Sequence, residues 1–95
     1  MIVTLVHHRV ADYGAWKEVY DAFADTQRRG GVRSQSVLRS TEDPNLIVVT
    51  HSFDTADAAH AFFSNEELKD AMAQAGVDIS TFTVEFLDEV ESGAP

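Results

Sequence analysis

Two short segments of this chain are apolar on both of the faces that a β-strand presents. Ile2, Val3, Leu5 and Val6 include both parities, and so do residues 46–49. Because successive side chains of a strand point to opposite faces, such segments are expected at the centre of a sheet, buried on both sides. The rest of the fold therefore has to cover both faces of these two strands.

The sequence between the two apolar segments has helical periodicity, and the predicted helix would cover one face of the sheet. From Asp12, a predicted N-cap, apolar and aromatic residues recur on one helical face until residues 28–31, where Arg-Arg-Gly-Gly predicts the helix end. A second helical region ends at Gly76. Within it, Ser64 and Glu67 have the spacing of a capping box, which predicts a break into two helical pieces.

The order of the predicted elements indicates the fold class. Predicted strands cover residues 2–9, 32–40, 46–53 and 79–90. With the two helical regions they give the order βαββαβ, a ferredoxin-like α+β fold with a four-stranded antiparallel or mixed sheet. We expect one domain over residues 1–95, with the first and third strands adjacent and parallel at its centre.

The net charge and the absence of cysteine limit the kinds of partner and of metal site that the chain can have. Sixteen acidic against seven basic side chains give a formal charge of −9, which disfavours nucleic acid and anionic membranes. No cysteine is present, so disulfides and thiolate metal sites are excluded. The first ten residues lack the basic start and long apolar run of a signal peptide or membrane span, so we expect a cytoplasmic protein.

One face of the predicted sheet has no cover within the chain. Two helical regions cover a single face of four strands, yet the central strands are apolar on both. For a small chain without disulfides, a second copy across a two-fold axis is the simplest cover. The sequence therefore predicts a homodimer formed through the open sheet face.

Most of the chain resembles a known superfamily. The stretches VADYGAWKEVYD, GVRSQSVLRSTEDPNLIVVTHSFD and ELKDAMAQAGV are similar to the dimeric α+β barrel superfamily, specifically to small antibiotic-biosynthesis-monooxygenase-like and polyketide-cyclase-like proteins. The resemblance implies two ferredoxin-like sheets packed face to face, with a pocket between sheet and helices in each subunit. Members include cofactor-independent oxygenases, polyketide cyclases and haem-degrading enzymes.

The sequence departs from the family where cofactors are concerned. Haem-degrading and oxygenase members pair an asparagine with a tryptophan, whereas Asn45 and Asn65 fall in predicted turns and Trp16 in the first helix. The four histidines have no H-x-x-x-H or H-x-x-E spacing, which disfavours a metal site. We expect neither cofactor nor metal.

Three histidines are the candidate catalytic residues. His7 and His8 end the first strand, and His51 lies on the third. Parity predicts His7 and His51 on the helix side and His8 on the inter-subunit face, although one bulge would exchange these faces. A neutral imidazole is well suited to accept a proton near neutral pH. The alternative is that these are structural strand-end histidines bonded to backbone or carboxylate groups.

Five other residues are candidates for substrate binding. Aromatic and basic side chains expected near the histidines are Tyr13, Trp16, Tyr20, Arg39 and Phe53. The aromatics would line a pocket for a flat substrate and Arg39 would hold an anionic oxygen, although such a stripe is also typical of an ordinary core.

Two functions are consistent with these residues. The first is a cofactor-independent enzyme of the oxygenase, cyclase or isomerase type, acting on an apolar aromatic or polyketide-like substrate with a histidine as proton acceptor. The second is a non-catalytic homodimer that binds a small ligand or serves as an accessory subunit. We expect a small-molecule ligand as the partner, and the resemblance favours the enzyme.

Overall fold

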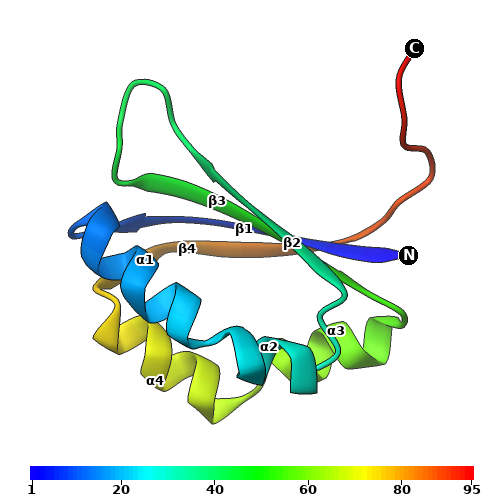
Figure 1. Ribbon diagram of the computed structural model, residues 1–95, viewed down its shortest axis with the longest axis horizontal. Coiled ribbons are helices and arrows are strands. Elements are labelled where there is room, and N and C mark those ends of the chain that lie inside the picture. The colour runs from blue at the N-terminus through cyan, green and yellow to red at the C-terminus, as the bar shows by residue number, and fades with distance from the viewer.

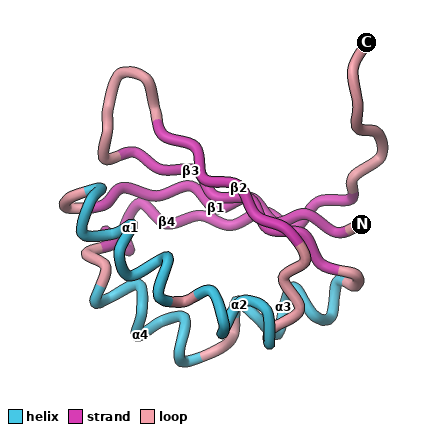
Figure 2. Tube along the Cα trace, in the orientation of Figure 1, coloured by secondary structure: helices cyan, strands magenta, loops and turns pink.

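The computed structural model describes residues 1–95 and contains four strands and four helices (Figure 1). In chain order they are β1 (Ile2–Val10), α1 (Tyr13–Ala22), α2 (Ala24–Arg29), β2 (Ser34–Arg39), β3 (Leu46–Phe53), α3 (Ala56–Phe63), α4 (Glu66–Gln74) and β4 (Val77–Asp88). All four helices lie on one side of a single sheet (Figure 2). None of them is long and apolar enough to span a membrane.

The sheet is antiparallel throughout, which confirms the ferredoxin-like α+β class and corrects one detail. Its strand order is β2-β3-β1-β4, with β1 and β3 at the centre as predicted. These two strands pair antiparallel, so the prediction that they are parallel is wrong. The helical crossover makes β2 parallel to β1, with β3 between them. Because β2 and β3 form a hairpin, β3 is antiparallel to both of its neighbours.

The helix ends follow the predicted capping chemistry in part. The Asp12 carboxylate accepts a hydrogen bond from the Ala15 amide at 2.9 Å and starts α1. The first helical region is divided at Phe23, whereas the sequence predicted one continuous helix. The second divides as predicted, but Asn65 caps α4, because the Ser64 hydroxyl donates back to the His60 carbonyl.

The side chains of β1 face the opposite way from the prediction, which placed His7 on the helix side and His8 on the open face. In the antiparallel register Thr4 pairs with His51, and His8 pairs with Ile47. Cross-strand partners share a face, so His8 and His51 both face the helices. His7 has the opposite parity, is exposed, and lies on the open face. The apolar set of β3, centred on the fully buried Ile47, fixes this choice.

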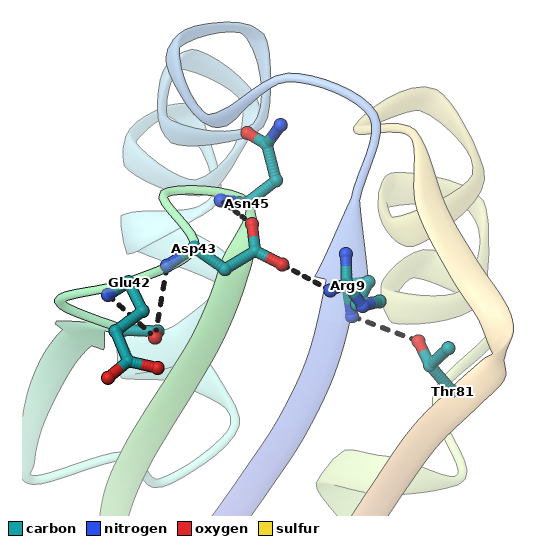
Figure 3. Close-up of polar contacts among 6 residues, drawn as sticks. Arg9, Glu42, Asp43, Asn45 and Thr81 are labelled. Carbon is teal, nitrogen blue, oxygen red and sulfur yellow. Dashed lines mark hydrogen bonds and ion pairs between the residues drawn. The ribbon is translucent and has the colours of Figure 1, made fainter.

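A hydrogen-bonded cluster joins the end of β1 to its neighbours (Figure 3). The Arg9 amide donates to Thr81 Oγ1 at 2.9 Å, and its guanidinium pairs with Asp43 in the β2–β3 turn. Asn45 in the same turn donates its amide to Asp43 and accepts from the Tyr13 amide at 3.0 Å through its side chain. These contacts fix the first turn of α1 above the end of β1, where the histidines lie.

Candidate functional site

Two histidines lie buried between the sheet and the helices. His8 on β1 is 3% exposed and His51 on β3 is 5% exposed. The register places Thr4, which is fully buried, directly across from His51 on the same face. The helix-facing side of the two central strands therefore carries three polar side chains within an apolar core.

Most of the polar atoms of these three residues have no hydrogen-bond partner. They are Thr4 Oγ1, both ring nitrogens of His8 and Nδ1 of His51. Leaving a buried polar group unpaired costs about 1–3 kcal/mol. Such groups are rare in native proteins, and they are candidates for a functional role. The structural alternative for His8 and His51, a bond to backbone or a carboxylate, has no counterpart among these contacts.

His51 makes a single polar contact, and it points to one tautomer. Its Nε2 lies 3.4 Å from the Tyr20 hydroxyl. That hydroxyl donates to Gln35 Oε1 at 2.8 Å. With the hydroxyl proton on Gln35, Nε2 carries the imidazole proton and donates to Tyr20. Nδ1 of His51 is then an unprotonated, unpartnered base.

Burial keeps both imidazoles neutral at pH 7. It lowers the pKa of His51 to about 4, because the cavity does not solvate the imidazolium. Burial lowers the pKa of His8 to about 4 as well, with a smaller contribution from the neighbouring His7. The pKa of the Tyr20 phenol is raised, chiefly by burial, so this side chain remains a hydrogen-bond donor.

Aromatic rings enclose the two histidines. Trp16 stacks on Tyr20 with ring centroids 4.9 Å apart and lies 5.8 Å from the His8 ring. Phe62 lies 5.6 Å from the His51 ring. The site is thus bounded by flat apolar surfaces, which are suited to contact with an aromatic ligand.

Two small adjoining cavities occupy the space between sheet and helices. The first, of about 50 Å³, is bounded by Trp16, Phe23, His51 and Phe62, and the second, of about 60 Å³, by Val6, His8 and Phe82. Five residues line both cavities, namely Trp16, Tyr20, His51, Leu68 and Met72. The shared walls make them two parts of one site, with room for only a few water molecules as they stand.

The structure brings together four of the residues predicted for the site and separates the others. His8, His51, Trp16 and Tyr20 line the cavities. His7 does not, because it lies on the opposite face of the sheet.

The remaining predicted residues lie outside the cavity walls. Arg39 packs over the Tyr13 ring, with the guanidinium carbon 4.4 Å from the ring centroid. Phe53 is fully buried in a second apolar cluster with Val32, Ala59 and Phe62. Arg39 is therefore not placed to hold an anionic oxygen in the cavity.

Sequence reasoning missed Thr4, Gln27 and Gln35. Thr4 shares the parity of His8, which had been assigned to the wrong face. Gln27 is 7% exposed and lines the first cavity, and Gln35 accepts the Tyr20 proton. Gln27 falls on the apolar face of the first helical region, and a polar residue at such a position is the signal by which it could have been found.

No group of three or more potential metal ligands occurs among the histidines, aspartates and glutamates. The polar side chains that line the cavities include the Tyr20 hydroxyl, the Gln27 amide and the imidazoles of His8 and His51. Their chemistry is that of hydrogen bonding and proton transfer.

Comparisons with known proteins agree with the fold and show the family of the chain. A family model described as antibiotic biosynthesis monooxygenase matches residues 6–74. Among curated proteins, no significant match is found.

Solved structures share the fold at low sequence identity. A proposed antibiotic biosynthesis monooxygenase from Bordetella bronchiseptica has a TM-score of 0.80 at 14% identity, covering 95% of this chain and 97% of that chain. One from Deinococcus radiodurans has a TM-score of 0.77 at 13% identity, covering 100% and 98%. SnoaB, a cofactor-independent oxygenase from Streptomyces nogalater, has a TM-score of 0.73 at 14% identity, covering 99% and 96%.

Proposed function

Because this chain belongs to the antibiotic biosynthesis monooxygenase family, we propose that it is a cofactor-independent oxygenase acting on an apolar aromatic or polyketide-like compound. One observation carries the proposal: His51, a neutral imidazole whose buried Nδ1 has no hydrogen-bond partner, lines a cavity walled by aromatic rings. A base of this kind is the element that the chemistry requires from the protein.

The first step is removal of a proton from carbon. Nδ1 of His51 takes the proton of an acidic methylene group, and the electron pair of the C–H bond stays on the substrate as an enolate. An imidazolium without a counter-charge is disfavoured here, because burial lowers the pKa of His51. The enolate supplies the missing counter-charge, so the two ions stabilise each other in the dry cavity. The site therefore selects substrates that form a delocalised anion.

The second step uses dioxygen as the oxidant. The enolate carbon transfers electrons to dioxygen, a C–O bond forms, and the resulting peroxide takes the proton held by His51. Loss of water, in which the O–O bond breaks and the second methylene proton leaves, gives a carbonyl group. One methylene group and one dioxygen molecule thus become one carbonyl group and one water molecule. Carbon is oxidised, dioxygen is reduced, and no other reductant is consumed.

Labelled dioxygen tests this proposal. Purified protein is incubated under oxygen-18 gas with a panel of hydroxyaryl ketones and aryl 1,3-diketones that carry an acidic methylene. We expect one labelled oxygen atom in the product and one molecule of dioxygen consumed per turnover. Tight binding of panel members without dioxygen uptake would contradict the proposal and identify the non-catalytic ligand-binding protein instead.

Tyr20→Phe is expected to lower the turnover rate about tenfold while leaving substrate binding nearly unchanged. The variant removes the hydroxyl that holds the His51 tautomer and keeps the ring that stacks on Trp16. Tyr20 acts through His51 and is a positioning residue. Steady-state oxygen electrode measurements give kcat and KM separately, and a loss confined to KM would contradict the assigned role.

The open sheet face supports a second part of the proposal, a homodimer. Val3, Leu5 and Val48 on this face are only half-buried within one chain. Leu38 and Leu87 at its two edges are 52% and 39% exposed. An apolar face of this kind is costly in water, and a second copy of the chain covers it by two-fold symmetry.

Charged substitutions at the edges of this face are expected to dissociate the dimer. Leu38→Lys combined with Leu87→Lys places like charges at the contact without touching the buried core. Sedimentation at micromolar concentration should show a monomer for this variant and a dimer for the wild type. Val90→Lys, in the exposed tail, is the control and should remain dimeric. A monomeric wild-type protein would contradict the dimer.

A further inference from the structure

We propose that the cavity pair opens at both edges of the sheet, through two entrances of different chemistry, and that the apolar entrance admits dioxygen. The entrance at β2 is polar and the entrance at β4 is apolar. The assignment of dioxygen rests on the proposed function, whereas the two entrances are inferred from side chains that line both a groove and a cavity.

The polar entrance is a groove of about 320 Å³ between the α1–α2 segment and the start of β2. Tyr20 and Gln27 line both this groove and the first cavity, so the two spaces adjoin at these side chains. The outer residues include Arg28 and Arg33, whose guanidinium groups are paired with Asp25 and Asp54. The Asp21 carboxylate, which also lines the groove, is paired with Lys17. The amides and hydroxyls of the groove suit the oxygen substituents of a neutral aromatic compound.

The apolar entrance is a groove of about 390 Å³ between α4 and β4. Phe63, Met72 and Phe82 line both this groove and the second cavity. Ile79 lies on its outer side and is 61% exposed. Lys69 is the only charged residue that lines the groove.

Met72 is placed to control passage through the apolar entrance. It lines this groove and both inner cavities. Methionine has flexible torsions and changes rotamer at low cost. Helix α4, which carries it, has no fully buried residue, so small displacements of this helix disturb little packing.

Physical chemistry assigns the two entrances to different reactants. Dioxygen is apolar and partitions into apolar surroundings, whereas a hydroxylated substrate loses less solvation beside amides and hydroxyls. A substrate that has entered past Tyr20 and Gln27 also fills that path. A second opening then lets dioxygen reach the enolate without the substrate leaving.

The fluorescence of Trp16 reports on both routes. Trp16 is the single tryptophan of the chain, is 4% exposed, and lines both cavities. Collisional quenching of its excited-state lifetime by dissolved dioxygen measures the passage of a small apolar molecule. Quenching by acrylamide measures the passage of a polar amide. Neither measurement requires substrate or turnover.

Two matched alanine substitutions separate the entrances. Ala73→Phe places a ring at the apolar groove, and Ala24→Phe places the same ring at the polar groove. We expect Ala73→Phe to reduce dioxygen quenching of Trp16 severalfold with little effect on acrylamide, and Ala24→Phe to do the reverse. Ala73→Leu, a smaller substitution at an exposed helical position, is the second variant if the first folds poorly.

Two results of the quenching experiment would overturn the proposed apolar route. Equal dioxygen quenching in wild type, Ala73→Phe and Ala73→Leu would overturn the apolar route. So would equal loss in the variants of both entrances. If the expected pattern is found in a protein that consumes no dioxygen with the substrate panel, the entrances stand and the proposed oxygenase activity fails.

Discussion

Replacing His51 with glutamine is expected to lower the rate of dioxygen uptake by at least about 100-fold, the usual contribution of a general base. Glutamine has nearly the shape of histidine and keeps a polar end toward Tyr20, but it does not accept a proton near neutral pH. The loss should appear in kcat, because the base acts in the transition state. An oxygen electrode with the most reactive panel substrate measures it.

The control is a histidine of the same chain on the other side of the sheet. His7→Gln changes an exposed side chain, whereas His51→Gln changes one that is 5% exposed at the cavity. Thermal unfolding of both variants separates loss of the base from loss of the fold. Full activity in a folded His51→Gln variant would contradict the assignment of the base.

The free energy of unfolding is expected to fall steeply as the pH decreases from 6.5 to 4. Well above pH 6.5, His8 and His51 are neutral in both states and contribute no pH dependence. Below it, the unfolded chain binds protons at the ordinary pKa of 6.5, whereas the folded chain, with pKa values of about 4, does not. The difference corresponds to about 3 kcal/mol for each histidine by pH 4.

Urea denaturation across this pH range measures the effect. The doubly substituted variant His8→Leu and His51→Leu lacks both groups, so its stability should fall much less between pH 6.5 and 4. The difference between the two curves removes the contribution of carboxylates, which is common to both proteins. Parallel curves for the variant and the wild type would show that neither imidazole is held neutral by burial.

The strands and helices were accessible to sequence reasoning because their signals are local. The doubly apolar segments correctly placed β1 and β3 at the centre of the sheet. Asp12 marked the start of α1 through its side-chain bond to the Ala15 amide. In each case the residues that make the element also carry the pattern that reveals it.

Which side chains of each strand face the helices could not be predicted from local patterns in the same way. Both parities of β1 carry apolar residues and one histidine, so hydrophobicity alone does not choose between them. The choice comes from the register, which pairs His8 with Ile47 and Thr4 with His51. Because side chains alternate between the two faces of a strand, a shift of one residue assigns every side chain to the wrong face.

The cavity walls depend on contacts between distant segments. Gln27 and Met72 reach the site from helices of different regions, and no local pattern in the sequence brings them together. The Tyr20 contact to Gln35 and His51 likewise joins three elements. Such contacts become visible only when the helices are placed on the sheet.

The measurement that tests this account most directly is an NMR titration of the His51 imidazole. It is made on the free protein, and again under anaerobic conditions with the panel compound that supports dioxygen uptake. We expect a pKa near 4 in the free protein, as burial dictates, and a raised pKa in the complex, where the enolate supplies the counter-charge. A pKa near 6.5 in the free protein, or the same value in both states, would contradict the buried neutral base on which the proposed chemistry depends.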